Sequence, residues 1–490
     1  MKASIRVLCF MFVFCFMAGA AFCPSPVFAA KAEKKAKAAQ TEAVAKWAAN
    51  PKSSFDAGKM SDMSDFDPNT WEGPKGDDVI KIAYVNAFSG PAAINGQIHV
   101  LPIMWAVHDI NKRGGIMVDG KKRLVTVIKA DHMSKPDQCK KIVERMVLQE
   151  KVHVLMGTSG SNLMKIINEV GNKYKIPVLN QGAPTDSLMD AENFGRYSFM
   201  PYFGVNQVGR SFAYYYGQIR KKETKFYILC QDYSFGHEIA EGFKQGMKEF
   251  FPEAQIVGED YHKLFMTDFA PYLTKIKASG ADVIFSGDWP PDSSNLLKQA
   301  RQLGINIPLA DIYGDEPNVL HEIGIEKSKG IVGISPYETS PSFKTPGQIK
   351  LHKAWIDQSK KWKAPYNSFI YRHGISNLSA WMMYTYWLLD VIERARSTDA
   401  EKILAVWEGD TYGLPNGKIL KMSACDHKGI QDLLVVELVP PEEQKASFNI
   451  PPYHWYEGCS FYGTGHMVPA EKVIPWMDPK LDRCKGQSGL

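Results

Sequence analysis

Ile80–Gln97 reads IKIAYVNAFSGPAAINGQ, and this stretch decides the fold class. Val79–Val85 is an almost continuous run of apolar and β-branched residues, which predicts a buried strand. A Ser-Gly-Pro sequence at 89–91 ends this strand, and a helical pattern follows over Gln97–Arg113. A strand that runs into a helix in this way directs backbone N–H groups toward whatever lies at its carboxyl end. An ordinary βα connection is the alternative interpretation.

The same alternation continues along the chain in two series. The first has strand patterns over Leu124–Ala130, Val152–Met156 and Pro177–Leu179, with helical patterns near Lys135–Glu150 and Ser161–Tyr174. The second has helical patterns over Val205–Ile219, Gly236–Phe250, Phe269–Lys277 and Ser293–Leu303, with strand patterns over Lys225–Cys230, Gln255–Gly258 and Val283–Ser286. Two such series predict an α/β fold of two doubly wound lobes with parallel-type central sheets.

Length and charge narrow the class of protein. A chain of 490 residues exceeds what one hydrophobic core normally serves, which also favours two lobes. The formal net charge is +5, and basic and acidic residues are mixed along the chain. This distribution gives no basis for binding nucleic acid or a membrane surface.

The N-terminal segment predicts export. Residues 1–29 combine a basic start, an apolar run from Val7 to Phe22 and small residues at a Val-Phe-Ala cleavage pattern over 27–29, as in a signal peptide. A lipid anchor on Cys23 is the second interpretation, although Phe22 stands where such sites need a small residue. No later stretch contains eighteen consecutive apolar residues, so we expect an exported soluble protein.

Five cysteines follow this segment, and an oxidising compartment permits one or two disulfides among them. Cys459 and Cys484 lie close together in a tail with little regular pattern, which favours this pair. Cys230 ends a strand pattern, so we expect a buried free thiol there. The cysteines show no C-x-x-C spacing, and no metal site is expected.

Several short motifs in the two series resemble one known family. They are Ser89-Gly90-Pro91, Asp109-Ile110-Asn111, Gly114-Gly115-Ile116, Gln138 with Lys141, Asp232–Gly236, and GDWPPDSSNLLKQAR over Gly287–Arg301. In this order and spacing they resemble the branched-chain amino-acid (Leu/Ile/Val) binding proteins of ABC importers. The resemblance covers roughly residues 79–437.

The resemblance implies a type I periplasmic binding fold, with two α/β lobes joined by three crossovers and a ligand held between them. The first lobe would comprise 79–200 and about 335–405, and the second 201–334 and about 406–437. Residues 30–78 would form a leader and linker, and 438–490 an irregular C-terminal extension.

The loop Gly157–Ser161 follows a predicted strand and carries three hydroxyl groups. Thr158, Ser159 and Ser161, with free N–H groups at a helix start, would suit a carboxylate. The alternative is that Ser159 or Ser161 only caps the helix. The resemblance favours the ligand site, since the family's serine-rich loop holds the ligand carboxylate here.

The loop after the next strand pattern would flank the same cleft. The resemblance implies that backbone groups of this loop, at Gly182 and Ala183, contact the ligand, and Thr185 could supply the family's threonine hydroxyl if the loop shifts. Pro184 occupies the position where the family has a hydroxyl group, and proline has no N–H group to donate. This departure argues against an ordinary amino-acid ligand.

Acidic and aromatic residues of the second series would close over the ligand. The resemblance places Asp292 where the family has an acidic residue that binds the ligand's ammonium group, whereas capping a helix is the alternative. Asp288 is a second acidic candidate, and Trp289 beside it suits stacking on the ligand.

Other candidate positions carry weaker signals. Phe235 falls where the family has a tyrosine that covers the ligand, and Tyr233 precedes it; both could instead be core residues. The resemblance adds Ser89 and Asn95 from the first loop. Arg372, with His373 beside it, could hold a carboxylate or form a structural ion pair.

Enzyme motifs are absent from the sequence. Gly157–Ser161 fails the G-x-S-x-G pattern, and neither G-x-x-x-x-G-K-[ST] nor H-E-x-x-H occurs. We therefore expect a non-enzymatic, monomeric periplasmic binding protein without a cofactor. It would deliver an amino acid, or an aromatic acid or amide, to an ABC permease by hinge closure. The alternatives are a soluble periplasmic sensor for a membrane receptor and an extracellular hydrolase.

Overall fold

The computed structural model describes residues 50–314, 320, 323–335, 345–373, 380–415, 417–439, 461–474 and 480–485. The predicted signal peptide, Cys23 and Cys459 lie outside these residues. All described residues belong to one unit of the chain, 47–490. Within them, no helix has the length and apolar character needed to cross a membrane.

The first sheet contains five parallel strands in the order β5-β2-β6-β7-β8. These strands are β2 (Ile80–Asn86), β5 (Val125–Asp131), β6 (Val154–Gly157), β7 (Val178–Asn180) and β8 (Ser198–Phe199). Six of the seven β2 residues are buried, as expected for a central strand whose sheet is covered on both faces. The apolar run predicted to be a buried strand, Val79–Val85, therefore forms β2.

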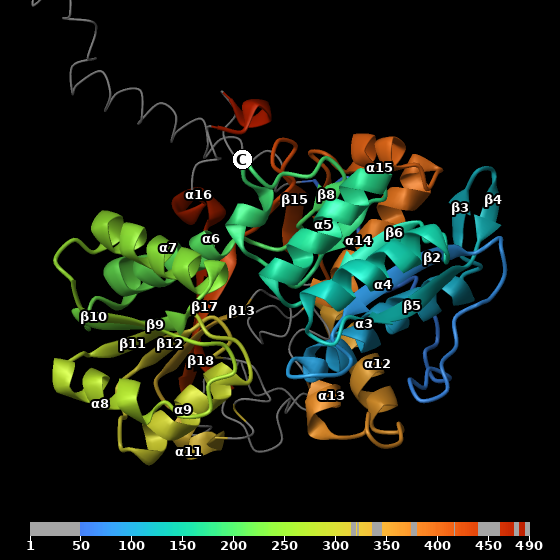
Figure 1. Cartoon of the computed structure of the whole chain (residues 1–490). Helices are drawn as coiled ribbons and strands as arrows, with labels where there is room; N and C mark the ends of the chain where they lie inside the picture. Colours follow the sequence, from blue (N-terminus) through green and yellow to red (C-terminus); the bar gives the residue numbers. More distant parts are fainter. Residues whose placement is uncertain are drawn as a thin grey trace, which may run out of the picture. The chain divides into compact units, whose positions relative to one another are not determined.

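Helices flank the first sheet. They are α3 (Ala93–Lys112), α4 (Pro136–Leu148) and α5 (Ser161–Tyr174) from the first series, with α14 (Ala380–Ala395) from much later in the chain. Helices α4 and α5 pack on each other, and α14 packs on α3. In Figure 1, α4 and α5 lie in front of this sheet. We call the first sheet and these helices the first lobe.

The second sheet has seven strands in the order β10-β9-β11-β12-β13-β17-β18. They are β9 (Lys225–Gln231), β10 (Gln255–His262), β11 (Val283–Ser286), β12 (Leu309–Asp311), β13 (Ile331–Ser335), β17 (Leu433–Val439) and β18 (Phe461–Val468). The pairings are parallel as far as β13, and β17 and β18 then add antiparallel.

Four helices cover the two faces of the second sheet (Figure 1). Helices α6 (Val205–Tyr214, continued by a π-helix over Tyr215–Arg220) and α7 (Ser234–Phe250) lie on one face, and α8 (Ala270–Ser279) and α9 (Asp292–Gln302) on the other. We call this sheet and these helices the second lobe. The predicted α/β fold with parallel central sheets is confirmed.

Smaller elements complete the described chain. A four-stranded sheet contains β1 (Ser53–Ser54), β14 (Thr411–Gly413), β15 (Ile419–Met422) and β16 (Gly429–Ile430), and β3 (Ile116–Val118) pairs with β4 (Lys121–Arg123). The remaining helices are Asp186–Met189, α11 (Ile325–Ser328), α12 (Pro346–Ser359), α13 (Phe369–His373), α15 (Ala400–Trp407), α16 (Ala470–Val473) and Asp482–Cys484.

The segment before β2 differs from the expected linker. Met60, Met63 and Phe66 are buried in the main core, and the Phe66 ring lies 5.2 Å from Trp105. The side chain of Gln358 donates a hydrogen bond to the carbonyl of Phe66. A few well-spaced apolar residues therefore anchor a mostly polar segment, which composition alone did not indicate.

The segments that follow α14 are also placed differently from the expected lobe boundaries. Trp387 in α14 donates a hydrogen bond to Asp410 and stacks on Tyr412, so the chain around β14 packs on the first lobe, whereas β17 and β18 extend the sheet of the second. Strand β18 forms within the tail that was expected to be irregular, because it pairs with β17 along its whole length.

The cysteine pairing predicted from the sequence is wrong for Cys484. Cys484 forms a disulfide with Cys425, 59 residues away, with an S–S distance of 2.11 Å. The fold brings the turn after β15 to the C-terminal helical turn, whereas the sequence prediction relied on proximity along the chain. Cys230 is a buried free thiol, as predicted, and so is Cys139.

Candidate functional site

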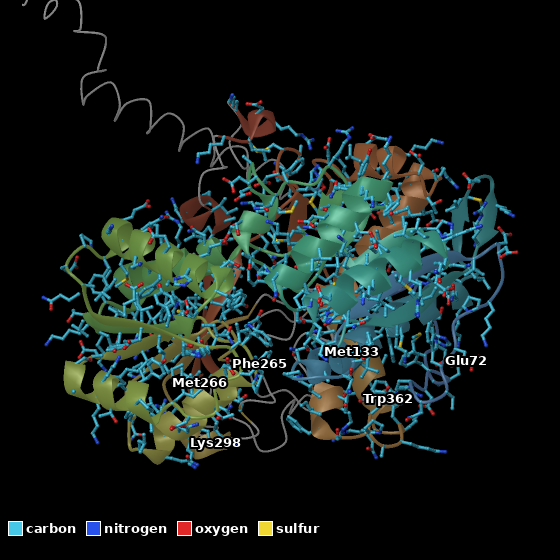
Figure 2. The ribbon with its side chains drawn as sticks, viewed as in Figure 1. Glu72, Met133, Phe265, Met266, Lys298 and Trp362 are labelled. Atoms are coloured by element: carbon cyan, nitrogen blue, oxygen red, sulfur yellow. A yellow bond between two sulfur atoms is a disulfide. The ribbon has the colours of Figure 1, made fainter. Side chains whose placement is uncertain are left out.

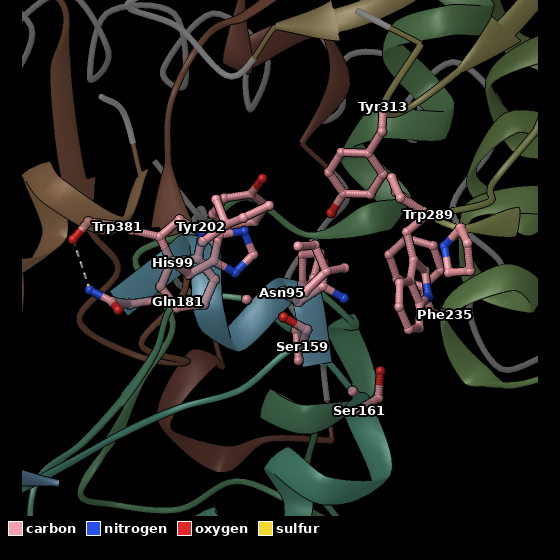
Figure 3. Close-up of a pocket in the computed structure, with 18 of the residues that line it drawn as sticks. Asn95, His99, Ser159, Ser161, Gln181, Tyr202, Phe235, Trp289, Tyr313 and Trp381 are labelled. Carbon is pink, nitrogen blue, oxygen red and sulfur yellow. Dashed lines mark hydrogen bonds between the residues drawn. The ribbon is translucent and has the colours of Figure 1, made fainter. Parts of the chain in front are cut away.

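Loops from both lobes line a cavity of about 300 Å³ (Figure 3). The loops that follow β6 and β7 contribute from the first lobe, and the loop that follows β11 contributes from the second. Such loops are the usual ligand position in open α/β sheets. The lining residues are Ile94, Asn95, Ile98, His99, Ser159, Gly160, Ser161, Gln181, Gly182, Ala183, Pro184, Tyr202, Tyr233, Phe235, Trp289, Pro290, Pro291, Ser294, Asn295, Tyr313, Ile370 and Trp381.

The serine loop between β6 and α5 forms one part of the cavity. Helix α5 has Gly160 at its N-cap and no side-chain cap, so the capping alternative for Ser159 and Ser161 is wrong. The Oγ of Ser159 is buried and has no hydrogen-bond partner among the described residues, and Ser161 shares a 2.5 Å hydrogen bond with Thr185. Both serines line the cavity, beside the N-terminal turn of α5.

Thr158 and Thr185 lie behind this loop. Thr158 donates a hydrogen bond to Asn86 and lies 2.7 Å from Nε2 of His132, and both threonines are fully buried. They line an adjoining cavity of about 480 Å³, which shares Ser159, Ser161 and Trp289 with the first cavity. The hydrogen bonds of Thr158 and Thr185 hold the loop that carries the two serines.

The loop after β7 is shaped by one asparagine. Oδ1 of Asn180 accepts hydrogen bonds from the N–H groups of Gly182 and Ala183, and its Nδ2 donates to the carbonyl of Ala183. Gly182 and Ala183 line the cavity, as predicted, but their N–H groups already have this acceptor. A Cβ on Gly182 would lie 2.6 Å from the ring of Trp381, so glycine permits the close approach of that ring.

Aromatic residues form the side of the cavity that belongs to the second lobe. The rings of Tyr233 and Phe235 lie stacked 5.8 Å apart, and Nε1 of Trp289 donates a 2.8 Å hydrogen bond to the hydroxyl of Tyr233. All three predicted residues line the cavity, together with Pro290 and Pro291. Figure 3 shows Trp289 and Phe235 on the side opposite Trp381 and His99.

Asp292 does not reach the cavity. Its side chain is fully buried, and Oδ2 accepts hydrogen bonds from Gln231 (2.8 Å) and the N–H of Phe265 (2.9 Å). Burial raises the pKa of Asp292 to about 6. The expected contact with a ligand ammonium group is therefore not available, because the carboxylate faces the interior of the second lobe.

Three other candidates also lie outside the cavity. Ser89 is exposed and donates a 2.6 Å hydrogen bond to Asp131. Asp288 is fully buried next to His262. Arg372 does not line the cavity, although Ile370 of the same helix, α13, does.

Sequence reasoning missed several lining residues, among them His99 and Trp381. His99 lies one helical turn after Asn95 on α3, and its ring stacks on Trp381 at 4.1 Å. Burial lowers the pKa of His99 to about 3, so its ring is neutral at ordinary pH. The spacing of Asn95 and His99 on one helix face was the only signal in the sequence, since Trp381 comes from a distant helix.

The cavity contains no formal charge in the described part of the chain. None of its lining residues is an aspartate, glutamate, lysine or arginine, and its one histidine is neutral. Aromatic rings stand on both sides, with hydroxyl and amide groups between them. This arrangement suits a ring-containing ligand whose polar group is bound by neutral donors.

Comparison with known proteins agrees with this architecture. The sequence profile of the periplasmic binding proteins matches residues 79–445. The Leu/Ile/Val-binding protein homolog 4 of Brucella abortus (strain 2308) is 25% identical over 301 residues, which cover 59% of this chain and 68% of that protein.

Solved structures share the fold. A periplasmic binding protein from Burkholderia mallei has a TM-score of 0.67 at 20% identity, covering 84% of this chain and 100% of that one. An ABC-transporter solute-binding protein from Rhodopseudomonas palustris, in complex with 4-hydroxybenzoate, has a TM-score of 0.62 at 20% identity, covering 80% and 98%. The chain belongs to the periplasmic binding protein family, a family of non-enzymatic solute-binding proteins.

Proposed function

We propose that this protein captures an aromatic carboxylic acid between its two lobes and delivers it to the permease of an ABC importer. The uncharged cavity with aromatic rings on both sides is the observation that carries this proposal. The relative bound to 4-hydroxybenzoate supports the same ligand class, and the predicted signal peptide supports a periplasmic location.

The absence of charge in the described lining favours an aromatic acid over an amino acid. An amino acid carries an ammonium group, which needs an anionic or strongly polar partner when water is excluded. Asp292, the predicted partner, is buried away from the cavity. The Leu/Ile/Val-binding relative makes an amino acid the competing ligand.

A ligand carboxylate would lie against the serine loop. The first N–H groups of a helix have no intrahelical acceptors, and they attract negative charge. Helix α5 presents this end to the cavity, with Ser159 and Ser161 beside it. The ring of the ligand would then lie between Trp381 on the first lobe and Trp289 on the second.

Hinge closure would complete the site. The first lobe presents the serine loop, and the second lobe brings Tyr233, Phe235 and Trp289 over the ligand. Since the ligand contacts both lobes, it stabilises the closed form. A permease can recognise that form as the loaded protein.

Ligand titration of the mature protein tests this function. We expect saturable heat release with benzoate and 4-hydroxybenzoate in isothermal titration calorimetry, together with a rise in melting temperature. Leucine should produce neither effect at the same concentrations. Binding of leucine with no binding of either aromatic acid would contradict the proposed ligand class. Turnover of a bound compound, measured by mass spectrometry, would contradict the binding function itself.

A further inference from the structure

A buried histidine–aspartate pair lies directly behind the second-lobe side of the cavity. Nε2 of His262, at the end of β10, is 2.8 Å from Oδ2 of Asp288, and neither side chain is exposed. Asp288 precedes Trp289 in the chain. The loop 287–291, which we call the Trp289 loop, thus has the ligand cavity on one side and this pair on the other.

The position of the Trp289 loop depends on close packing. A Cβ on Gly287 would lie 2.3 Å from Ile239 and 3.1 Å from the sulfur of Cys230, so the start of the loop sits tightly on β9 and α7. The N–H of Asp288 donates to Ser286, and the N–H of Asp292 donates to the carbonyl of Trp289. The Asp288 carboxyl group bonds to His262, and the side chain of Ser286 and the backbone of Gln231 also interact with it.

Both ring nitrogens of His262 face an acceptor, so both contacts are satisfied together only when the pair holds one proton more than a neutral ring and a carboxylate. Nδ1 of His262 lies 2.9 Å from the carbonyl of Lys263, which only accepts, so Nδ1 carries a hydrogen. A neutral ring would then present a bare acceptor at Nε2 to a carboxylate, which is also an acceptor. The 2.8 Å contact needs a further proton, held either as imidazolium with carboxylate or as imidazole with carboxylic acid.

We propose that the proton shared by His262 and Asp288 holds the Trp289 loop in its ligand-binding position. Ligand binding is thereby coupled to protonation of a pair that never touches the ligand. His262 and Asp288 are positioning residues in this scheme, because they act through Trp289. The inference rests on the proposed function, since it concerns control of ligand binding in the same cavity by pH.

The surroundings of the pair favour retention of the proton. Burial alone lowers the pKa of His262, but the bond and charge of Asp288 more than offset it and raise the pKa above its ordinary value. Burial raises the pKa of Asp288, although the bond to His262 opposes this. The other titratable groups that face the cluster from neighbouring elements are Cys230, Tyr233, Tyr272, Asp292, Asp311 and Tyr313, and none is a cation.

The direction of the pH effect follows from these shifts. Because both pKa values of the pair are raised, the pair keeps this proton to a higher pH than an ordinary histidine does and loses it as the pH rises further. Loss leaves one hydrogen on a ring that faces two acceptors. With that hydrogen on Nδ1, bonded to the carbonyl of Lys263, Nε2 and the Asp288 carboxylate repel each other. The Trp289 loop then moves, and the second-lobe side of the cavity becomes incomplete.

One substitution converts the proton-dependent bond into a permanent one. In Asp288→Asn the side-chain amide can donate to the neutral ring of His262 at every pH. The loop should then keep its position as the pH rises. Asp311→Asn is the matched control, because it removes a carboxyl group from the same cluster but not the one bonded to His262.

The ligand-free protein provides the first readout. In protein labelled with 15N-histidine and 15N-tryptophan, we expect the indole N–H resonance of Trp289 to shift with the titration of the His262–Asp288 pair as the pH is raised through and above the ordinary histidine range. His262→Gln and Trp289→Phe assign the resonances. The shift should persist in Asp311→Asn and vanish in Asp288→Asn. A Trp289 resonance that stays constant, or that shifts equally in Asp288→Asn, would overturn the proposal.

Ligand affinity provides the second readout, with benzoate as the probe because its carboxyl group ionises well below this range. The Kd of the unmodified protein should rise about tenfold through the same transition, corresponding to about one pKa unit of coupling. In Asp288→Asn it should stay constant. A constant Kd in the unmodified protein during a Trp289 shift would overturn the inference. If benzoate binds at no pH, the proposed ligand class fails, and the resonance alone decides whether the proton holds the loop.

Discussion

The two lobes build their sides of the cavity in different ways. On the first lobe, the loops after β6 and β7 are fixed by neutral hydrogen bonds, such as those of Asn180 to its own loop and of Ser161 to Thr185. On the second lobe, an aromatic surface lies over fully buried ionisable groups, of which Asp288 directly precedes Trp289 and pairs with His262.

This difference indicates a division of labour between the lobes. The neutral bonds of the first lobe have no proton to lose between about pH 5 and pH 8, and His99 stays neutral because burial lowers its pKa to about 3. The first lobe therefore offers a constant platform for the carboxylate. The second lobe supplies apolar area, and its position depends on groups whose protonation changes.

Trp289→Ala gives the largest expected loss of binding, because it removes the largest aromatic side chain from the second-lobe side of the cavity. Truncation of a buried aromatic anchor costs about 2–3 kcal/mol, which raises the Kd for benzoate about 30- to 150-fold. Isothermal titration calorimetry at constant pH measures this effect. The bond from Trp289 to Tyr233 is lost as well, so Tyr233 also becomes less fixed.

Trp71→Ala is the matched control, since Trp71 lines a separate groove and not the ligand cavity. Its Kd for benzoate should stay within about twofold of the unmodified value, the range normally seen for substitutions that touch no binding group. Equal losses in the two variants would mean that the second-lobe side of the cavity does not bind the ring.

Ser159→Ala tests the first-lobe side and should have a smaller effect. The hydroxyl of Ser159 has no partner in the described chain, so a ligand carboxylate would be its acceptor. A hydrogen bond to a charged group contributes about 1.5 kcal/mol or more, which predicts an increase in Kd of about tenfold. The melting temperature without ligand should hardly change, because no protein contact is lost.

Ser89→Ala is the control for that substitution. Ser89 was also predicted to bind the ligand, but it is exposed and bonds to Asp131 outside the cavity. Its Kd should equal that of the unmodified protein. A strong effect of Ser89→Ala with none of Ser159→Ala would place the carboxylate at the rim of the first lobe instead.

Local patterns in the sequence were sufficient for most of the fold. The β-branched run at Val79–Val85 and the alternating helices predicted parallel sheets, because apolar periodicity depends only on neighbouring residues. Figure 2 labels Met133 and Phe265, which lie in the turns that follow β5 and β10. Strand β18 was missed because its pairing with β17 is long-range and its own sequence is rich in glycine and aromatic residues.

The site was predictable only where a loop followed a recognisable strand. Ser159, Ser161 and Trp289 were found in this way, whereas Trp381 and Tyr313 were missed because they arrive from distant elements. For Asp292, in contrast, the sequence predicted a ligand-lining residue that does not line the cavity. Its position in the sequence fits a ligand contact, but the direction of a side chain at a helix start depends on tertiary partners, here Gln231 and the N–H of Phe265.

Asp292→Asn tests whether the Asp292 side chain contacts the ligand, and it should have the smallest effect on binding. The Oδ1 of asparagine can still accept from Gln231 and Phe265, and the side chain does not line the cavity. We therefore expect the Kd for benzoate to change by less than about twofold. An increase of tenfold or more would show that Asp292 acts on the ligand after all.

The stability of Asp292→Asn should nevertheless depend on pH in a defined direction. Burial raises the pKa of Asp292 to about 6 from an ordinary value near 4, so the folded protein binds this proton more tightly than the unfolded chain. The ionised side chain therefore destabilises the fold as the pH rises through about 6, and a neutral amide avoids that cost. Thermal unfolding at pH 4.5 and at pH 7.5 should show the variant gaining stability relative to the unmodified protein at the higher pH. A relative loss there would mean that the second lobe uses the negative charge of Asp292, and that its ionisable groups stabilise it as an ion network.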